Sequence, residues 1–361
     1  MRVLVAPDKF AGTLTAVEAA RAIADGWARQ APDDELDLAP MADGGPGFVD
    51  VLHAALGGEL AAVTVTGPHG EQVPGAVLRV GGRAFVESAQ ACGLSLSGGE
   101  RAESATTWGV GELVMHAIEA GATDVVVGLG GSGTNDGGAG LLGALGATAD
   151  RPLDGGTAAL AGVTALDLSP AQTRLQGIRL MAASDVDNPL TGLFGATKTF
   201  GPQKGIADDR LPVVDRVLEE LAAATDRRTA LDKGAGAAGG LGFALLLLGA
   251  TRRPGFDVVA EAVALAGRAR SADLVVTGEG AFDFSSRSGK VPYGVATVAA
   301  EALRPCVALA GRVLVGSREM RALGIESAYS LVDLVGEERA FGDPSGSLAD
   351  LAARVARTWS H

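Results

Sequence analysis

Five loops of the sequence place glycine next to carboxylate or lysine side chains directly after a short apolar run. These loops are residues 6–12 (APDKFAG), 41–47 (MADGGPG), 128–140 (GLGGSGTNDGGAG), 183–192 (ASDVDNPLTG) and 277–283 (TGEGAFD). If the apolar runs are parallel strands, their carboxyl ends meet at one edge of a sheet, where such folds bind ligands. Glycine lets backbone N–H groups approach a ligand, while carboxylates and lysines supply proton acceptors, metal ligands and positive charge. The five loops together therefore predict an active site.

The loop at residues 128–140 carries the strongest local pattern. Its glycines would let backbone N–H groups surround a phosphate, Ser132 and Thr134 can donate hydroxyl groups, and we expect a helix to begin just after Asp136. It has no lysine, so it is not a Walker A loop, and the dinucleotide-binding pattern fits it poorly. The alternative is a glycine-rich turn capped by Asn135 or Asp136.

Carboxylates recur in these loops at spacings that suit metal binding. Asp185 and Asp187 are two residues apart, so in an extended segment they would face the same side and suit Mg²⁺. The alternative is an Asx-turn before Pro189. Further candidate metal ligands or bases are Asp136, Glu279 and Asp283.

Three of the five lysines lie in loops bounded by glycine or proline. Lys9, Lys204 and Lys290 could each meet a phosphate or carboxylate as a point charge, although a solvated surface lysine is the alternative for each. Lys198 and Lys233 have weaker contexts, and we expect them to be surface residues. The four histidines fall outside the five loops, which disfavours histidine general-base chemistry and a zinc site.

Strands, loops and helices alternate at both ends of the chain, which predicts a parallel α/β sheet. A capping box (Thr15 and Glu18) marks the first helix. In between, three β-like runs at residues 61–67, 73–80 and 83–88 are separated by short turns, which predicts antiparallel hairpins. We therefore expect two α/β domains with the active site in the cleft between them. The expected domains are a discontinuous Rossmann-like parallel-sheet domain (residues 1–62 and 255–361) and an inserted mixed-sheet domain (63–254).

Composition narrows the classes of partner. Acidic residues outnumber basic ones by 43 to 30, and the resulting net charge of −13 disfavours nucleic acid and anionic membranes as partners. The two cysteines form no CxxC pair, and no signal-like or membrane-spanning apolar run is present, so we expect a cytoplasmic protein.

The motifs taken in order resemble those of the bacterial type I glycerate kinases. They are APDKF, MADGG, ESAQACGL, TTWGVGEL, GGSGTNDGGAG, SDVDNPL, FGPQKG, GAGAAGGLGFAL and TGEG followed by Asp and GK, and they run from Met1 to about Gly311. The resemblance implies two α/β domains and transfer of the γ-phosphoryl group of ATP to D-glycerate, with Mg²⁺ as the ion and 2-phosphoglycerate as the product. A monomer or a homodimer is expected.

Phosphoryl transfer requires positioning, neutralisation of charge and one base, and these needs assign the candidate residues. Asp187 or Asp185 would orient or deprotonate the glycerate hydroxyl, and Lys9 and Lys204 would meet carboxylate and phosphoryl oxygens. The expected nucleotide-binding residues are Gly130, Gly131, Ser132, Thr134, Asn135, Gly137, Gly138 and Lys290. The expected substrate-binding residues are Asp8, Asp43 and Asn188, and the expected metal ligands are Asp136, Glu279 and Asp283.

The sequence also departs from the common pattern of that family. The family pattern usually has a lysine at the position of Ala11, a glutamate at that of Pro46 and a threonine at that of Phe48. It usually has an arginine at the position of Ala281 and a glutamine at that of Ser285. These changes leave two alternatives open. One is a kinase for a different small hydroxy acid, and the other is a non-catalytic relative that binds a nucleotide or another anion.

Overall fold

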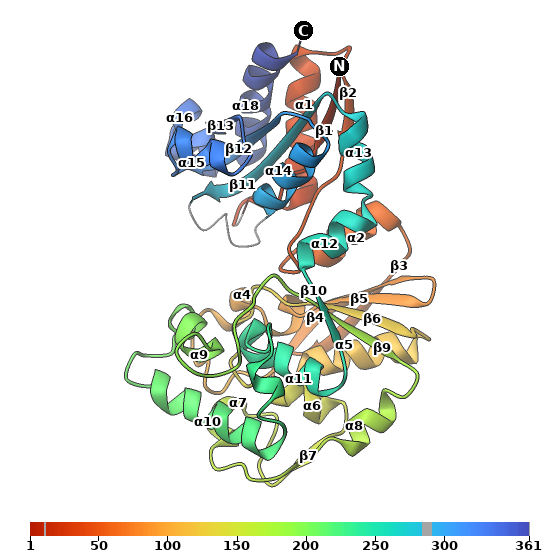
Figure 1. Cartoon of the computed structure of the whole chain (residues 1–361), viewed down its shortest axis with the longest axis vertical. Coiled ribbons are helices and arrows are strands. Elements are labelled where there is room, and N and C mark those ends of the chain that lie inside the picture. Colours follow the sequence, from red (N-terminus) through yellow and green to blue (C-terminus); the bar gives the residue numbers. More distant parts are fainter. Residues whose placement is uncertain (11, 284–290, 361) are drawn as a thin grey trace. The chain divides into compact units, whose positions relative to one another are not determined.

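The computed structural model describes residues 1–10, 12–283 and 291–360 (Figure 1). The chain divides into two compact units. The first comprises Met1–Asp43, Asp50–Leu56 and Phe256–His361, and the second comprises Gly44–Val49 and Gly57–Gly255. Each unit is built on its own sheet covered by helices, which confirms the predicted α/β fold class.

The first unit contains a five-stranded sheet in the order β13-β12-β11-β1-β2, and all its neighbouring strands pair in parallel. Its strands are β1 (Arg2–Val5), β2 (Glu35–Leu38), β11 (Leu274–Phe282), β12 (Cys306–Val313) and β13 (Ser327–Ser330). The central strands are buried on both faces, which explains why Val3, Leu4 and Val5 form an unbroken apolar run.

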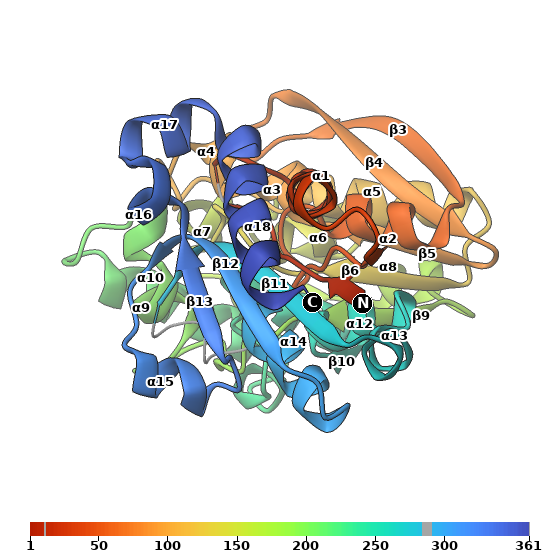
Figure 2. The same ribbon diagram turned by 90° about the horizontal axis from the view of Figure 1, so that it is seen from above.

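Helices cover both faces of this sheet, with α1 (Ala16–Gln30) and α18 (Pro344–Trp359) together on one side (Figure 2). The predicted capping box begins α1: Thr15 Oγ1 accepts from the Glu18 N–H, and the Glu18 carboxylate accepts from the Thr15 N–H. Ile23 and Trp27 of α1 are fully buried in a core with the apolar face of α18. The other helices are α2 (Phe48–Leu56), α12 (Gly255–Ala262), α13 (Leu265–Ser271), α14 (Val291–Glu301), α15 (Ser317–Ala322), α16 (Leu331–Val335) and α17 (Glu337–Gly342).

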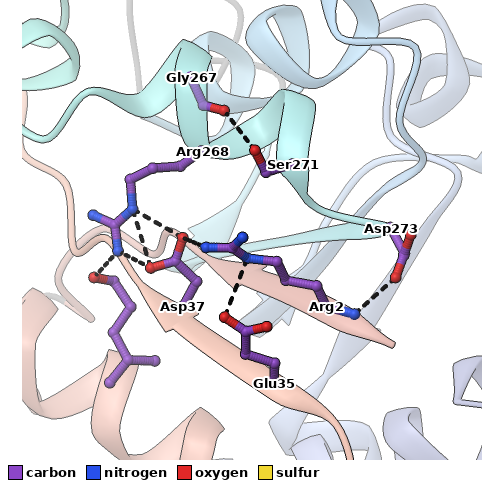
Figure 3. Close-up of polar contacts among 8 residues, drawn as sticks. Arg2, Glu35, Asp37, Gly267, Arg268, Ser271 and Asp273 are labelled. Atoms are coloured by element: carbon purple, nitrogen blue, oxygen red, sulfur yellow. Dashed lines mark hydrogen bonds and ion pairs between the residues drawn. The ribbon is translucent and has the colours of Figure 1, made fainter.

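Charged side chains join β1, β2 and α13 on the same unit (Figure 3). The guanidinium group of Arg268 donates to the Asp37 carboxylate and to the Leu38 carbonyl, 2.6 Å away. Arg2 lies 3.6 Å from the same carboxylate, and its backbone N–H donates to Asp273. Hydrogen bonds from Arg268 hold the pKa of Asp37 below its usual value, so this carboxylate stays ionised in the pair.

The second unit contains a six-stranded mixed sheet in the order β10-β9-β6-β5-β4-β3. The three strands that come first along the chain, β3, β4 and β5, pair antiparallel, as predicted. The remaining neighbours pair in parallel. The strands are β3 (Glu59–Thr66), β4 (Gln72–Val80), β5 (Arg83–Glu87), β6 (Asp124–Gly128), β9 (Arg179–Ala183) and β10 (Thr251–Arg253), with β7 (Thr148–Ala149) and β8 (Leu166–Asp167) as a separate pair.

Helix α5 (Trp108–Glu119) packs against β3, β4 and β5. The helix expected just after Asp136 begins two residues later, as α6 (Ala139–Ala144), because Gly137 and Gly138 have positive φ angles and belong to the preceding turn. The other helices are α3 (Ala89–Cys92), α4 (Leu94–Ser97), α7 (Gly156–Leu160), α8 (Ser169–Arg174), α9 (Ala196–Phe200), α10 (Leu211–Ala224) and α11 (Leu241–Leu247), with 3₁₀ turns η1 (Pro202–Lys204), η2 (Thr229–Leu231) and η3 (Ala237–Gly240). In the described ranges, no helix has the length and apolar character needed to cross a membrane.

Candidate functional site

Four of the five glycine-containing loops lie in pairs, one pair on each unit, and the loop at residues 41–47 is divided between the units. In the first unit the Asp8 N–H donates to the Gly278 carbonyl at 2.8 Å, so the loop after β1 runs beside β11. In the second unit the Leu129 N–H donates to the Ala183 carbonyl at 2.9 Å, which joins the loops after β6 and β9. The carboxyl ends of parallel strands therefore do bring the predicted loops together within each unit.

A pocket of about 400 Å³ lies at the carboxyl ends of β1, β11 and β12 in the first unit. Its charged lining comes from Asp8, Lys9, Asp43, Glu279 and Arg312. The volume is in the range of small-molecule sites, about 300–1,000 Å³. Two cations and three carboxylates thus face a space large enough for a small acid.

Lys9 joins two of these carboxylates. Its Nζ atom lies 3.5 Å from Oδ1 of Asp8 and 3.6 Å from Oδ1 of Asp43. Asp8 is only 7% exposed, and its burial raises the pKa of the carboxyl to about 6, an effect that Lys9 opposes and Asp43 reinforces. A carboxyl with a pKa near 6 is a stronger proton acceptor than an ordinary aspartate and is still ionised at neutral pH.

Of the predicted metal ligands, Glu279 lines this pocket and is 6% exposed, whereas Asp283 is half-buried just beyond β11. The described part of the chain contains no group of three or more histidine, cysteine or carboxylate side chains arranged to hold a metal ion. Magnesium in phosphoryl-transfer sites is held by one or two carboxylates together with substrate phosphates. The carboxylate of Glu279 is a candidate for one such ligand.

The loop after β6 is held against neighbouring backbone in the second unit. The Leu94 N–H donates to the Gly131 carbonyl at 2.7 Å, and the Gly133 N–H donates to the Cys92 carbonyl at 2.8 Å. A Cβ atom at Gly130 would lie 2.6 Å from the Cα of Gly45, so the loops after β6 and at residues 44–47 touch backbone to backbone. Glycine is required at this contact because any side chain would separate the two loops.

Asp136 organises the same loop from inside. It is fully buried, and its carboxylate accepts from the N–H and the hydroxyl of Thr107, both at 2.8 Å, and from the N–H groups of Gly138 and Gly140. Burial raises the pKa of this carboxyl, and the four donors oppose that effect. Both carboxylate oxygens are engaged within the protein, so we interpret Asp136 as a structural residue of the turn rather than as a metal ligand.

The other predicted loop residues are also buried. Thr134 and Asn135 have no exposed surface, and the side-chain amide of Asn135 donates to Thr197 Oγ1 at 2.9 Å. Ser132 is 7% exposed and accepts a hydrogen bond from Lys204. Lys204 is 2% exposed, which rules out the alternative of a solvated surface lysine.

Asp187, in the loop after β9, lies in a different environment from Asp8. Its side chain is 59% exposed and pairs with Arg252 at 2.6 Å and with Lys233 at 3.3 Å. Burial raises the pKa of Asp187, but its hydrogen bonds and charge interactions with Lys233 and Arg252 outweigh that effect and hold the pKa below the usual value. A carboxylate of this kind accepts a proton poorly.

Sequence reasoning missed several partners in this region. Lys233 is exposed, as expected, but it pairs with Asp187, and Arg252 reaches the same carboxylate from β10, the strand next to β9. Asp185 is half-buried, and the Asn188 amide donates to the Phe194 carbonyl at 2.7 Å. Arg252 lies within the strand β10 and not in a loop, so the search for charged loop residues gave no signal for it.

The positions that depart from the family pattern fall in different places. Phe48 is fully buried and packs edge-to-face on Phe85, and the neighbouring N–H groups of Gly47 and Val49 donate to the buried Glu87 carboxylate. Ala281 lines the pocket of the first unit. Ala11, Ser285 and the predicted phosphate contact Lys290 lie outside the described residues.

Comparison with known proteins decides the family. The family model described as the glycerate kinase family matches residues 3–360. The chain belongs to the glycerate kinase family. A glycerate kinase from Bacillus subtilis is 40% identical over 92% of this chain and 90% of the relative, and a glycerate 2-kinase from Escherichia coli K12 is 36% identical over 99% and 98%. A crystal structure of a glycerate kinase 2 from Salmonella typhimurium LT2 superimposes with a TM-score of 0.82 at 36% identity, over 99% of this chain and 98% of that one.

Proposed function

We propose that this protein is an ATP-dependent glycerate kinase that phosphorylates D-glycerate and releases 2-phosphoglycerate and ADP. The observation that carries the proposal is the match to the glycerate kinase family along residues 3–360, with relatives named glycerate kinase at up to 40% identity over almost the whole chain. The identity of the nucleotide, the stereochemistry of the acid and the position of the new phosphate belong to the proposal.

In this proposal Asp8 is the general base. The glycerate hydroxyl oxygen attacks the γ-phosphorus of ATP while the hydroxyl proton passes to the Asp8 carboxylate. The bond from the γ-phosphorus to its bridging oxygen breaks, and ADP leaves with the electron pair. The pKa of about 6 and the position of Asp8 in the pocket favour it over Asp187, which is exposed, ion-paired and lowered in pKa.

Positive charge for the anionic reactants comes from the same pocket. Lys9 and Arg312 line it, and both can form charge-assisted hydrogen bonds with a carboxylate or a phosphoryl group. Mg²⁺ is the proposed ion, with Glu279 as the residue best placed to hold it because this buried carboxylate faces the same space. When bound, the ion would neutralise charge on the phosphates.

The loop after β6 is the proposed site for the nucleotide phosphates, through the N–H groups of Gly130 and Gly131 and the hydroxyl of Ser132. Its glycines and the buried Ser132 hydroxyl supply the donors that a phosphate needs. The roles of Asp43, Asp185 and Asn188 toward glycerate, of Asp283 toward the ion and of Lys290 toward phosphate stay predictions.

A second candidate function is a kinase for a different small hydroxy acid, and Ala281 is the observation that favours it. The family pattern usually has an arginine at this position, and Ala281 lines the pocket beside Arg312, so one cation is absent from the lining. The test is ADP release from ATP and Mg²⁺ with D-glycerate, L-glycerate, lactate or tartronate as the acceptor. Turnover of another acid at a rate above that with D-glycerate would favour the second function.

A further inference from the structure

Lys204 is a lysine buried inside the second unit, at the end of the 3₁₀ turn η1. Its Nζ atom donates to Ser132 Oγ at 3.0 Å and to the Thr134 carbonyl at 2.6 Å. Both acceptors belong to the glycine-rich loop after β6. A positive charge therefore reaches this loop from the interior of the unit, through a side chain that is 2% exposed.

These two hydrogen bonds have consequences for the loop's donors. An ammonium group can only donate, so Ser132 Oγ must be the acceptor, and the hydroxyl hydrogen of Ser132 is left to donate elsewhere. The Thr134 carbonyl and the Asn135 N–H belong to one planar trans peptide and point in opposite directions. By drawing the Thr134 carbonyl toward itself, Lys204 turns the Asn135 N–H away from the lysine.

Other hydrogen bonds anchor the loop at its two ends. Gly131 and Gly133 bond to the backbone of residues 92–94, and Asp136 binds the turn that precedes α6. Between these two anchors, Lys204 bonds to Ser132 and Thr134, and the side-chain amide of Asn135 donates to Thr197. The charged and titratable groups that interact with its ammonium group are the Cys92 thiol and the Asp136 carboxylate, and burial lowers the pKa of the lysine to about 8 despite them.

We propose that Lys204 is a positioning residue, which holds the loop from Gly131 to Asn135 in the conformation that presents the Ser132 hydroxyl to an anionic ligand. The lysine acts through the loop and does not itself contact the ligand. The identity of that ligand as a nucleotide phosphate rests on the proposed function, whereas the ordering of the loop does not.

The test compares the full-length wild type with Lys204→Met, Ser132→Ala and the double variant. Methionine keeps the length of the buried side chain and removes its charge and donors. Lys198→Met is the matched control, because Lys198 lies on the adjacent helix α9 and pairs with Asp215 instead of the loop. Each protein is examined in two experiments. The first measures amide hydrogen exchange of peptides covering residues 130–135, and the second measures kcat and the KM for ATP with D-glycerate.

We expect Lys204→Met to speed exchange of the loop amides by about tenfold or more and to raise the KM for ATP by about tenfold, with a smaller change in kcat. Ser132→Ala should have a weaker effect in the same direction. The double variant should resemble Lys204→Met within about twofold, because the two residues act through one contact. Lys198→Met should leave loop exchange and KM unchanged.

Unchanged loop exchange in Lys204→Met would overturn the proposal, and a large loss of kcat with unchanged exchange would assign the lysine to direct contact with the substrate. If Lys204→Met does not fold, unchanged exchange in Ser132→Ala overturns it instead. If the wild type shows no kinase activity, the proposed function fails, and the exchange comparison alone still decides the role of Lys204.

Discussion

The ammonium group of Lys9 lies 3.5 Å from the carboxylate of Asp8, yet the pKa of that carboxyl is about 6 and not below its usual value of 3.8. Burial of Asp8 outweighs the attraction of the lysine, and the nearby charge of Asp43 adds to the effect. A buried carboxylate that sits beside a cation and still binds a proton readily is the arrangement expected of a general base beside an anionic substrate.

Replacing Asp8 with asparagine removes the proposed proton acceptor while keeping the shape of the side chain. We expect kcat to fall by about 10²–10⁴-fold, the usual contribution of general-base catalysis. Steady-state turnover of Asp8→Asn with D-glycerate measures this. The matched control is Asp43→Asn, which also removes a partner of Lys9 but has a more exposed side chain, 33% against 10%, and should lose less activity. Turnover of Asp8→Asn within about threefold of wild type would exclude Asp8 as the base.

The raised pKa of Asp8 also makes the free energy of unfolding depend on pH. The folded pKa of about 6 exceeds the ordinary 3.8, so the folded protein binds this proton more tightly than the unfolded chain does. The stabilisation by that proton is complete below about pH 4 and is lost as the pH rises through 6. At pH 7.5 we therefore expect Asp8→Asn to raise the free energy of unfolding by about 1–3 kcal/mol, and at pH 4 to change it little. Urea titration at the two pH values measures the difference, and an equal effect at both would contradict the raised pKa.

Asp187 offers a contrast, since its side chain is 59% exposed and paired with Arg252 and Lys233. Exposed ion pairs contribute about 0–1 kcal/mol, so Asp187→Asn should leave the free energy of unfolding almost unchanged. We expect turnover to fall by less in Asp187→Asn than in Asp8→Asn. The Asp187→Asn variant should also keep the decline in kcat/KM below about pH 6 that protonation of Asp8 causes. A pH profile of both variants distinguishes them. A larger loss in Asp187→Asn, with that acid limb removed, would transfer the role of base to Asp187.

The interpretation of Asp136 as a structural carboxylate is testable by stability. Asp136→Asn replaces an acceptor of four hydrogen bonds with a group that carries two donors, in a site without exposed surface. We expect a loss of about 3 kcal/mol or more in the free energy of unfolding, with or without Mg²⁺. The exposed Asp154, in the same unit, supplies the control variant Asp154→Asn, which should change stability by less than about 0.5 kcal/mol. Unchanged stability together with a raised Mg²⁺ requirement for turnover would restore Asp136 as a metal ligand.

The local parts of the fold could be predicted from the sequence because neighbouring residues determine them. The capping box of Thr15 and Glu18 and the three antiparallel runs are readable from spacing and turn length alone, and the structure confirms both. The α/β class follows from the alternation of apolar strands and amphipathic helices. The glycine at position 130 could be recognised as a close backbone approach, although not what it approaches.

The environments of the site residues could not be predicted in the same way, because they depend on contacts between distant segments. Lys204 bonds to Ser132 and Thr134, 72 and 70 residues away, and its flanking glycine and proline suit an exposed lysine equally well. Asp187 and Asp8 both follow buried strands, but their pKa values shift in opposite directions because Asp8 is buried, whereas Asp187 is exposed and paired with Lys233 and Arg252. Residue type and loop position thus located candidate groups but did not determine their charge state.

The central claim is that this member of the glycerate kinase family phosphorylates D-glycerate with ATP. The most direct test incubates the purified protein with D-glycerate, ATP and Mg²⁺, and follows ADP release while ³¹P NMR resolves 2-phosphoglycerate from 3-phosphoglycerate. We predict ADP release that requires D-glycerate, one molecule of phosphoglycerate for each ADP, and the 2-phosphoglycerate signal alone. No glycerate-dependent ADP release would contradict the claim, and 3-phosphoglycerate as the product would contradict the proposed position of transfer.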